Sequence, residues 1–173
     1  MSSARAVALV EAARAGDSQS FARLYQVFGP VVHAVVVARV PVDAAEDIMQ
    51  DVFETALERI GQLREPAAFV GWLLTIARNR ATDWLRRKRP TTELDEAQVA
   101  APAKPTAEAE QVLEVIRSLP DAYSETLVMR FVEGMTGPEI AARTGLSHGS
   151  VRVNLTRGMK LLRAKLALRG RHV

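Results

Sequence analysis

The amino-acid sequence predicts an all-α protein, and three observations support this. Apolar residues recur at helical spacing along most of the chain. No stretch shows the sustained apolar-polar alternation with β-branched enrichment that a half-buried strand requires. Gly and Pro interrupt the pattern, as they do between helices. The Val-rich segment after Pro30 is the one ambiguous stretch, and we interpret it as a helix as well.

In the first half of the chain, turn signals separate the predicted helices. Gly16-Asp17 ends the first helix. Gly29-Pro30 separates the second from the third, because a proline inside a helix removes a hydrogen bond and clashes with the preceding turn. Pro66 precedes the last predicted helix of this half. The predicted helices are Ser3–Ala15, Ser20–Phe28, Val31–Arg39, Ala44–Ile60 and Ala67–Arg87.

The second half carries the clearest helix-capping signals. Thr136 to Glu139 reads as a capping box with a proline early in the helix. Gly145 can adopt the left-handed conformation that ends this helix, Leu146 is expected to fill the core between two helices, and Ser147 caps the next one. This arrangement predicts a helix-turn-helix. The predicted helices are Glu108–Ser118, Ala122–Glu133, Pro138–Thr144 and His148–Leu168.

Composition excludes several classes of protein. The 173 residues are 48% apolar and 25% charged, which is typical of a globular chain with one mid-sized or two small domains. The absence of Cys excludes disulfides, thiol catalysis and Cys-based metal sites, and agrees with a reducing compartment. The longest apolar run, Val31–Val40, is far shorter than the roughly 20 residues that span a bilayer, and no export signal is visible. We expect a cytoplasmic protein with no membrane insertion.

The charges are distributed in blocks, although the net charge is only +3. Residues 78–89 contain six basic side chains and one acidic one, residues 146–173 contain seven basic and no acidic side chains, and the segment 91–110 is acidic. Such blocks indicate polyanion contact at two places. Three prolines punctuate Pro90–Thr106, as in a linker. The expected organisation is two domains, 1–90 and 108–173, joined by a flexible acidic linker at 91–107.

The predicted helix Ala44–Ile60 has one apolar half and one acidic face. Four acidic residues, here called the acidic ridge, share that face: Asp47, Asp51, Glu54 and Glu58. A solvated surface is one interpretation of the ridge. A basic partner helix is the other, because no Lys is interleaved to form the usual i,i+4 ion pairs.

The predicted helix Ala67–Arg87 carries an aromatic residue on a polar face. That face contains Trp72, Thr75, Asn79, Thr82 and Arg86, with Arg78 at its edge. The combination favours single-stranded nucleic acid, because arginine follows phosphates, Asn and Thr reach base edges, and an exposed aromatic ring stacks on an unpaired base. A position for Trp72 at the rim of the core is the alternative interpretation.

The predicted helix His148–Leu168 is basic opposite its apolar stripe. The exposed face is predicted to contain Arg152, Val153, Thr156, Arg157, Lys160 and Arg163. Arginine can pair bidentately with guanine, Val and Thr can contact a thymine methyl group, and the later cations can reach phosphates. The alternative is a basic amphipathic helix that only packs against its neighbours.

No catalytic constellation is visible in the sequence. Gly145 to Gly149 matches the nucleophile-elbow pattern of hydrolases, but a predicted helix precedes it where the elbow requires a strand. His33, His148 and His172 share no metal-ligand spacing. We predict no catalytic residues, no metal site and no cofactor.

With these features in place, the chain resembles the bacterial sigma factors of the extracytoplasmic-function (ECF) type, which retain only two sigma domains. The segments that carry the resemblance are Phe21–Tyr25, Asp43–Phe53, Phe69–Arg87 and Leu119–Leu166. The resemblance implies a protein that is not an enzyme. Instead it gives promoter specificity and strand opening to RNA polymerase.

The resemblance also implies a partner for each face. Contacts with the coiled coil of the polymerase β′ subunit are implied for Asp47, Gln50, Asp51, Phe53 and Glu54. Contacts with the melted minus-10 element are implied for Arg64, Trp72, Thr75, Arg78, Asn79, Thr82 and Arg86. Contacts with the duplex minus-35 element are implied for Ser147, Arg152, Val153, Thr156, Arg157, Lys160 and Arg163. An anti-sigma factor is a further implied partner. The alternative function is a helix-turn-helix regulator that binds duplex DNA without polymerase.

Overall fold

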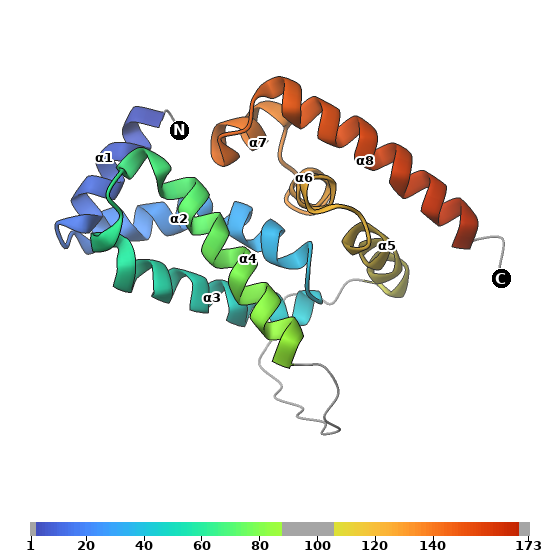
Figure 1. Cartoon of the computed structure of the whole chain (residues 1–173), viewed down its shortest axis with the longest axis horizontal. Coiled ribbons are helices and arrows are strands. Elements are labelled where there is room, and N and C mark those ends of the chain that lie inside the picture. The colour runs from blue at the N-terminus through green and yellow to red at the C-terminus, as the bar shows by residue number, and fades with distance from the viewer. Residues whose placement is uncertain (1–2, 88–105, 170–173) are drawn as a thin grey trace.

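The computed structural model describes residues 3–87 and 106–169, and within them every regular element is a helix, as predicted (Figure 1). The first half contains α1 (Ser3–Arg14), α2 (Ser18–Val37), α3 (Val42–Arg59) and α4 (Phe69–Arg87), with short 3-10 turns η1 (Ile60–Gln62) and η2 (Pro66–Ala68) before α4. The second half contains α5 (Ala107–Arg117), α6 (Asp121–Phe131), α7 (Gly137–Thr144) and α8 (His148–Arg169). Residues 91–105 of the expected linker lie outside the described residues.

The predicted break at Gly29-Pro30 is wrong, because α2 runs through Pro30 without interruption. Gly29 explains part of this tolerance: the ring of a proline normally clashes with the Cβ of the preceding residue, and glycine has none. Burial explains the rest, because Leu24, Phe28 and the valines after Pro30 are almost fully inaccessible. At the N-terminus of α2, Ser20 Oγ donates to Asp17 Oδ2 at 2.6 Å, and this hydrogen bond lowers the pKa of Asp17.

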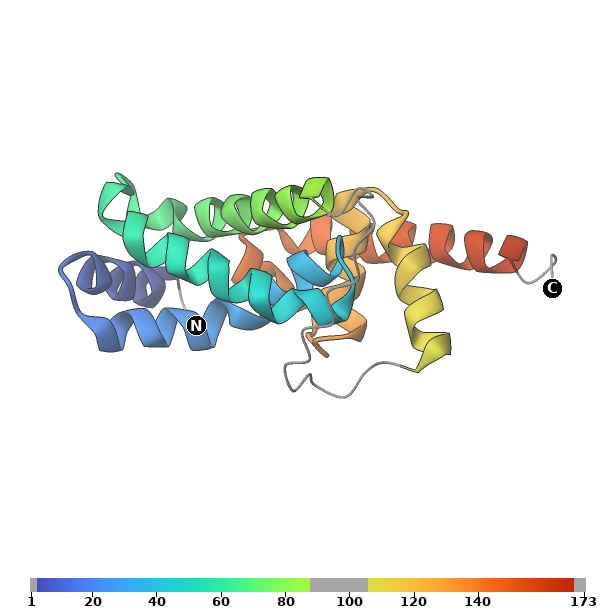
Figure 2. The ribbon, with the colours of Figure 1, turned by 90° about the horizontal axis from the view of Figure 1, so that it is seen from below.

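Helix α2 is the central helix of the first half and contacts α1, α3 and α4 (Figure 2). The rings of Phe28 and Phe69 lie 5.7 Å apart where α2 meets the start of α4. By length and composition α2 is the one helix in the described part of the chain that could cross a membrane. More than half of it is buried inside the protein, so packing against other helices accounts for its apolar composition.

In the second half, α6 lies among α5, α7 and α8. The crossing of α6 with α8 depends on Gly158, which is buried. A Cβ atom at this position would stand 3.1 Å from Leu127 Cδ1 and 3.2 Å from Tyr123 Cβ. The absence of a side chain at Gly158 therefore sets how closely the two helices approach.

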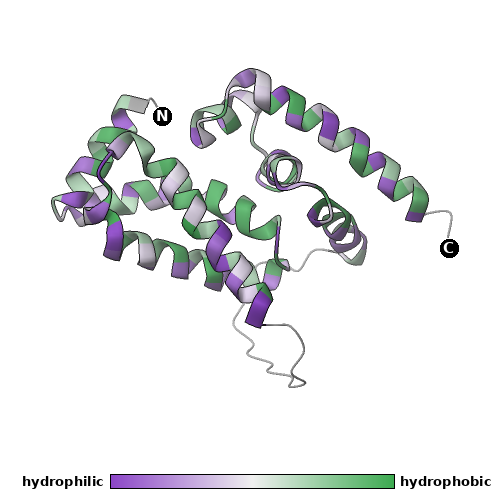
Figure 3. Ribbon diagram, in the orientation of Figure 1, coloured by the Kyte–Doolittle hydropathy of each residue, from purple (hydrophilic) through white to green (hydrophobic). Residues whose placement is uncertain are grey.

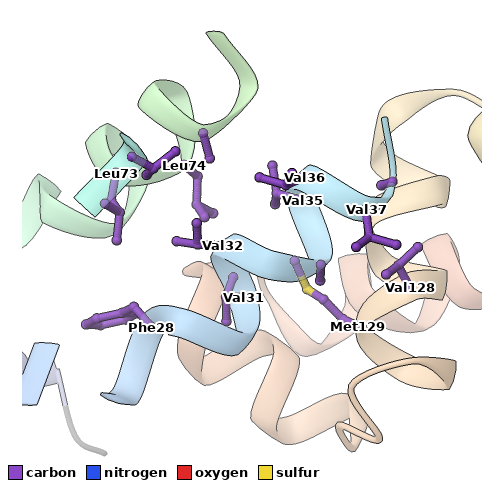
Figure 4. Packing of buried hydrophobic residues seen from close by; sticks show 14 of the residues in the cluster. Phe28, Val31, Val32, Val35, Val36, Val37, Leu73, Leu74, Val128 and Met129 are labelled. Atoms are coloured by element: carbon purple, nitrogen blue, oxygen red, sulfur yellow. The ribbon is translucent and has the colours of Figure 1, made fainter. Parts of the chain in front are cut away.

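The two halves share one hydrophobic core. Val31, Val35 and Val37 of α2 are fully buried, and Val128 and Met129 of α6 belong to the same apolar cluster. Figure 4 shows α2 between α4, which contributes Leu73 and Leu74, and α6. Helix α2 also contacts α7. The valine-rich end of α2 is thus covered by both halves of the chain.

Candidate nucleic-acid interface

The capping signals that predicted the helix-turn-helix are confirmed. Thr136 N donates to Glu139 Oε2 at 2.8 Å, Glu139 N donates to Thr136 Oγ1 at 3.4 Å, and Gly145 has a φ of 77°. Ser147 caps α8 by accepting a hydrogen bond from Ser150 N at 3.1 Å. The bonds from Thr136, its backbone N–H first, lower the pKa of Glu139. These contacts fix the turn between α7 and α8.

Leu146 does not fill the core between α7 and α8, so that expectation is wrong. Leu146 is 40% exposed and lines a cavity that Leu74 of α4 and Met129 of α6 also line. The core at this turn is made by Ile140 and Val151, which are buried. Leu146 instead faces the junction between the two halves of the chain.

Helix α8 carries hydrophobic and hydrophilic residues along its whole length (Figure 3). Val151, Gly158 and Leu162 are buried. The residues predicted on the opposite face are all exposed: Ser147, Arg152, Val153, Thr156, Arg157, Lys160 and Arg163. No ion pair with a described residue involves the four cations of this face, whereas Lys165 and Arg169 turn back to bond Ser118 and Glu114. The exposed cations therefore remain available to an external polyanion.

The acidic ridge on α3 is exposed. Asp47, Asp51, Glu54 and Glu58 face solvent, and Gln50 donates a hydrogen bond of 2.9 Å to Glu54. Phe53 is different, because it is only 4% exposed. Its ring lies 4.4 Å from that of Tyr25 and 6.5 Å from that of Phe21, measured between centroids. Phe53 thus anchors α3 to α2 from beneath the surface that the ridge presents.

The polar face of α4 is partly exposed. Thr75, Asn79 and Arg86 of α4 face solvent, as does Arg64 in the turn before it, while Thr82 is half-buried. The hydroxyl groups of Thr75 and Thr82 each donate to a carbonyl one turn earlier in α4, at 2.8 Å. On this face, Asn79 and the hydroxyl oxygen of Thr75 remain exposed for base or phosphate contacts. Arg86 is exposed as well and pairs with Asp83 at 3.9 Å.

Trp72 lies at the rim of the core. Its side chain is half-buried, and its ring centroid is 5.9 Å from that of Phe69. The two interpretations of Trp72 are therefore compatible, because a half-buried indole can pack against the core and still present part of its surface to solvent.

Arg78 is engaged by the other half of the chain. Its Nε donates to Glu125 Oε1 and its Nη2 to Glu125 Oε2, both at 2.9 Å. This hydrogen-bonded carboxylate raises the pKa of Arg78. Sequence reasoning did not identify Glu125, because local periodicity carries no signal for a contact between residues 47 positions apart.

No group of three or more His, Asp or Glu side chains in the described part of the chain is placed to hold a metal ion. The candidate surfaces are two exposed polar faces, on α4 and α8, and one acidic face on α3. Such surfaces can bind macromolecules through charge and hydrogen bonding.

Comparison with known proteins identifies the family. Residues 24–91 match the family model of Sigma-70 region 2, and residues 109–162 match that of Sigma-70, region 4. The chain is also 31% identical, over 175 residues, to the ECF RNA polymerase sigma factor RpoE of Cereibacter sphaeroides, covering 93% of this chain and 94% of the relative. The chain belongs to the ECF sigma factor family.

Two further comparisons place this sigma factor among its relatives. It is 36% identical over 171 residues to the probable RNA polymerase sigma factor RfaY of Xanthomonas campestris pv. campestris, covering 91% of this chain but only 43% of that longer protein. It shares its fold with CnrH in complex with the cytosolic domain of CnrY, at a TM-score of 0.60 and 24% identity, covering 95% and 98% of the two chains. Sigma factors are transcription initiation factors and are not themselves catalysts.

Proposed function

We propose that this sigma factor binds core RNA polymerase in the cytoplasm, directs it to promoters, and helps to open the DNA strands for transcription initiation. The observation that carries the proposal is the presence of region 2 and region 4 matches in one chain whose helix-turn-helix presents an exposed basic helix. The expected organisation, domains 1–90 and 108–173 with a linker at 91–107, is part of the proposal. The chain itself contributes recognition and no catalytic chemistry.

In this proposal, the acidic ridge docks on the coiled coil of the polymerase β′ subunit. Asp47, Asp51 and Glu54 provide exposed carboxylates on successive turns of α3, and Gln50 adds an amide beside them. Acidic side chains arranged in this way complement a basic helix and accelerate its encounter. Phe53 acts from within the protein by holding α3 against α2.

Helix α4 and the turn that contains Arg64 receive the melted minus-10 element. Arg64 and Arg86 stand at the two ends of this surface and contact phosphates, while Thr75 and Asn79 lie between them and reach base edges. The exposed edge of Trp72 provides a stacking surface for an unpaired base. Thr82 and Arg78 complete the surface.

Helix α8 reads the duplex minus-35 element in the major groove. Ser147, Arg152, Val153 and Thr156 lie near its N-terminus, the end that contacts base edges in helix-turn-helix proteins. Arg163 lies 11 residues after Arg152, which at 1.5 Å per residue is about 16 Å along the axis. Lys160 and Arg163 therefore reach phosphates at the edge of the groove, with Arg157 between the two groups.

We further propose that an anti-sigma protein is a partner. The support is the fold shared with CnrH, which was solved in complex with the cytosolic domain of CnrY. A protein that covers the acidic ridge of α3 and the basic face of α8 together would prevent both polymerase docking and DNA recognition.

Reconstituted transcription tests the proposed function. The full chain is added to core polymerase and genomic DNA fragments, and the transcripts are sequenced to find common start sites. We expect defined starts that require the chain; an absence of stable polymerase binding would refute the proposal. A symmetric footprint on duplex DNA, indifferent to core enzyme, would instead establish a helix-turn-helix regulator.

A matched pair of variants on α3 tests the docking surface. Asp51→Arg reverses a charge within the ridge, whereas Glu46→Arg makes the same change at an exposed position to one side of it. We expect Asp51→Arg to weaken binding to core polymerase and Glu46→Arg to have little effect. Equal losses in the two variants would show that net charge, and not the ridge, governs binding.

A further inference from the structure

Glu125 bridges two arginines from different parts of the first half. Besides the two bonds from Arg78 of α4, its Oε1 lies 2.8 Å from Nη2 of Arg39, which follows the end of α2. The side chains of Glu125 and Arg39 are each only 9% exposed. We call Glu125, Arg39 and Arg78 the arginine clamp.

Other polar contacts surround the clamp and join the same two halves. Arg39 also pairs with Asp121 at the start of α6. His33 Nδ1 contacts Glu133 Oε1, and Arg117 Nε donates to the carbonyl oxygen of Val37 at 3.0 Å. These contacts lie around the apolar packing of α2 on α6, so the junction has a buried apolar centre with directional polar contacts at its sides.

The clamp engages a side chain that the proposed function assigns to DNA. A carboxylate that accepts two parallel N–H bonds from one guanidinium offers the same geometry as a phosphate group. Glu125 therefore binds the same N–H groups of Arg78 that a phosphate of the minus-10 strand would bind. The two ligands cannot bind these N–H groups of Arg78 at once.

We propose that the arginine clamp holds the free sigma factor in a closed state, in which Glu125 acts as an internal competitor of the promoter strand for Arg78. Separation of α6 from α2 and α4 releases Arg78 for DNA. The role of Arg78 in DNA binding rests on the proposed function, whereas the closure itself rests only on the contacts of the clamp.

A distance measurement tests the closure. Because the chain has no Cys, spin labels can be attached at Glu58→Cys on α3 and Ala167→Cys on α8, both exposed positions. The full chain should give one narrow distance distribution, and Glu125→Gln should broaden it towards longer distances. A broad distribution in the parent chain, or the same distribution in both, would overturn the proposal.

A binding measurement tests the competition. The probe is a 20-nucleotide single-stranded DNA of mixed sequence, followed by fluorescence anisotropy. Glu125→Gln should strengthen binding about tenfold, as the loss of one charge-assisted contact predicts, and Arg78→Ala should abolish that gain while changing the affinity of the closed parent chain much less. Equal effects of Arg78→Ala in both backgrounds would overturn the competition.

Two further variants keep these tests decisive. Glu114→Gln removes a carboxylate that pairs with Arg169 inside the second half, and should change neither readout. If Glu125→Gln lowers the helix content measured by circular dichroism, Asp121→Asn replaces it, because this side chain is 71% exposed and touches only the edge of the clamp. It should shift both readouts in the same direction by a smaller amount, and no shift would overturn the proposal.

The two proposals fail separately. If the chain neither binds core polymerase nor supports transcription, the proposed function fails, and the spin-label distances still decide whether the clamp closes the chain. If transcription is supported but Glu125→Gln leaves distances and DNA affinity unchanged, the clamp fails and the proposed function stands.

Discussion

The crossing of α6 and α8 gives the sharpest stability prediction. Gly158→Ala adds one methyl group at a position where it would stand 3.1 to 3.2 Å from Leu127 and Tyr123. Leu127 is fully buried, so its side chain has little room to turn away, and the Tyr123 atom is a Cβ that cannot yield without moving α6. Such overpacking costs about 1–3 kcal/mol. Replacing glycine with alanine inside a helix raises the free energy of unfolding by about 1 kcal/mol. We expect a net loss of up to about 2 kcal/mol.

Urea unfolding of the full chain, followed by circular dichroism, measures this loss. Gly149→Ala is the matched control on the same helix, because its methyl group would meet only Ser147 Oγ, at 3.8 Å. This variant should be neutral or more stable than the parent. In a Leu127→Ala background, which itself costs about 2–5 kcal/mol, the penalty at Gly158 should shrink, because only the contact with Tyr123 Cβ remains. A Gly158→Ala effect equal in both backgrounds, or as favourable as Gly149→Ala, would refute the close crossing.

Three further predictions concern the helix-turn-helix. Arg152→Ala should weaken binding to the cognate minus-35 duplex by about 1–3 kcal/mol and leave polymerase binding intact; a filter-binding assay showing the same loss on unrelated duplexes would reassign Arg152 to phosphate contact. Thr136→Ala removes the cap of α7 and should lower the free energy of unfolding by about 1 kcal/mol in urea titrations, and an unchanged midpoint would contradict the role of the cap. Because the pKa of Glu139 is lowered from 4.5 in the folded state, its contribution to stability is present above about pH 4.5 and is lost as the pH falls through the folded value. Glu139→Gln should therefore flatten the acid limb of the stability profile measured between about pH 3 and 6; a profile parallel to that of the parent would argue against the capping box.

Local patterns predicted the helix-turn-helix well because its determinants are close in sequence. The capping box, the left-handed Gly145 and the Ser147 cap each involve residues no more than a few positions apart. The exposed face of α8 follows from the helical period alone. The acidic ridge on α3 was also found this way, whereas Gln50 and Phe53 were implied only by the family resemblance. The helical period placed Phe53 in the apolar half of α3, but it could not show that Phe21 and Tyr25 of α2 cover its ring.

Tertiary contacts decided what the sequence pattern could not. Pro30 reads locally as a helix break, but burial of the flanking residues keeps α2 continuous. Leu146 reads as a core residue of the turn, yet it is partly exposed and lines a cavity together with residues of α4 and α6. The partner of Arg78 comes from α6, far along the chain. In each case the deciding neighbour belongs to another helix, which no period along one helix can reveal.

The run of valines at the end of α2 makes that segment dependent on its cover. Valine loses side-chain rotamer freedom in a helix, so these turns have weak intrinsic helical preference and draw their order from the surrounding side chains. If α6 moved away, Val37 and its neighbours would be exposed to solvent on one side. The backbone amides there should then exchange with solvent deuterium sooner than those near Leu24, and an opened molecule would gain stability from any apolar surface that takes the place of α6.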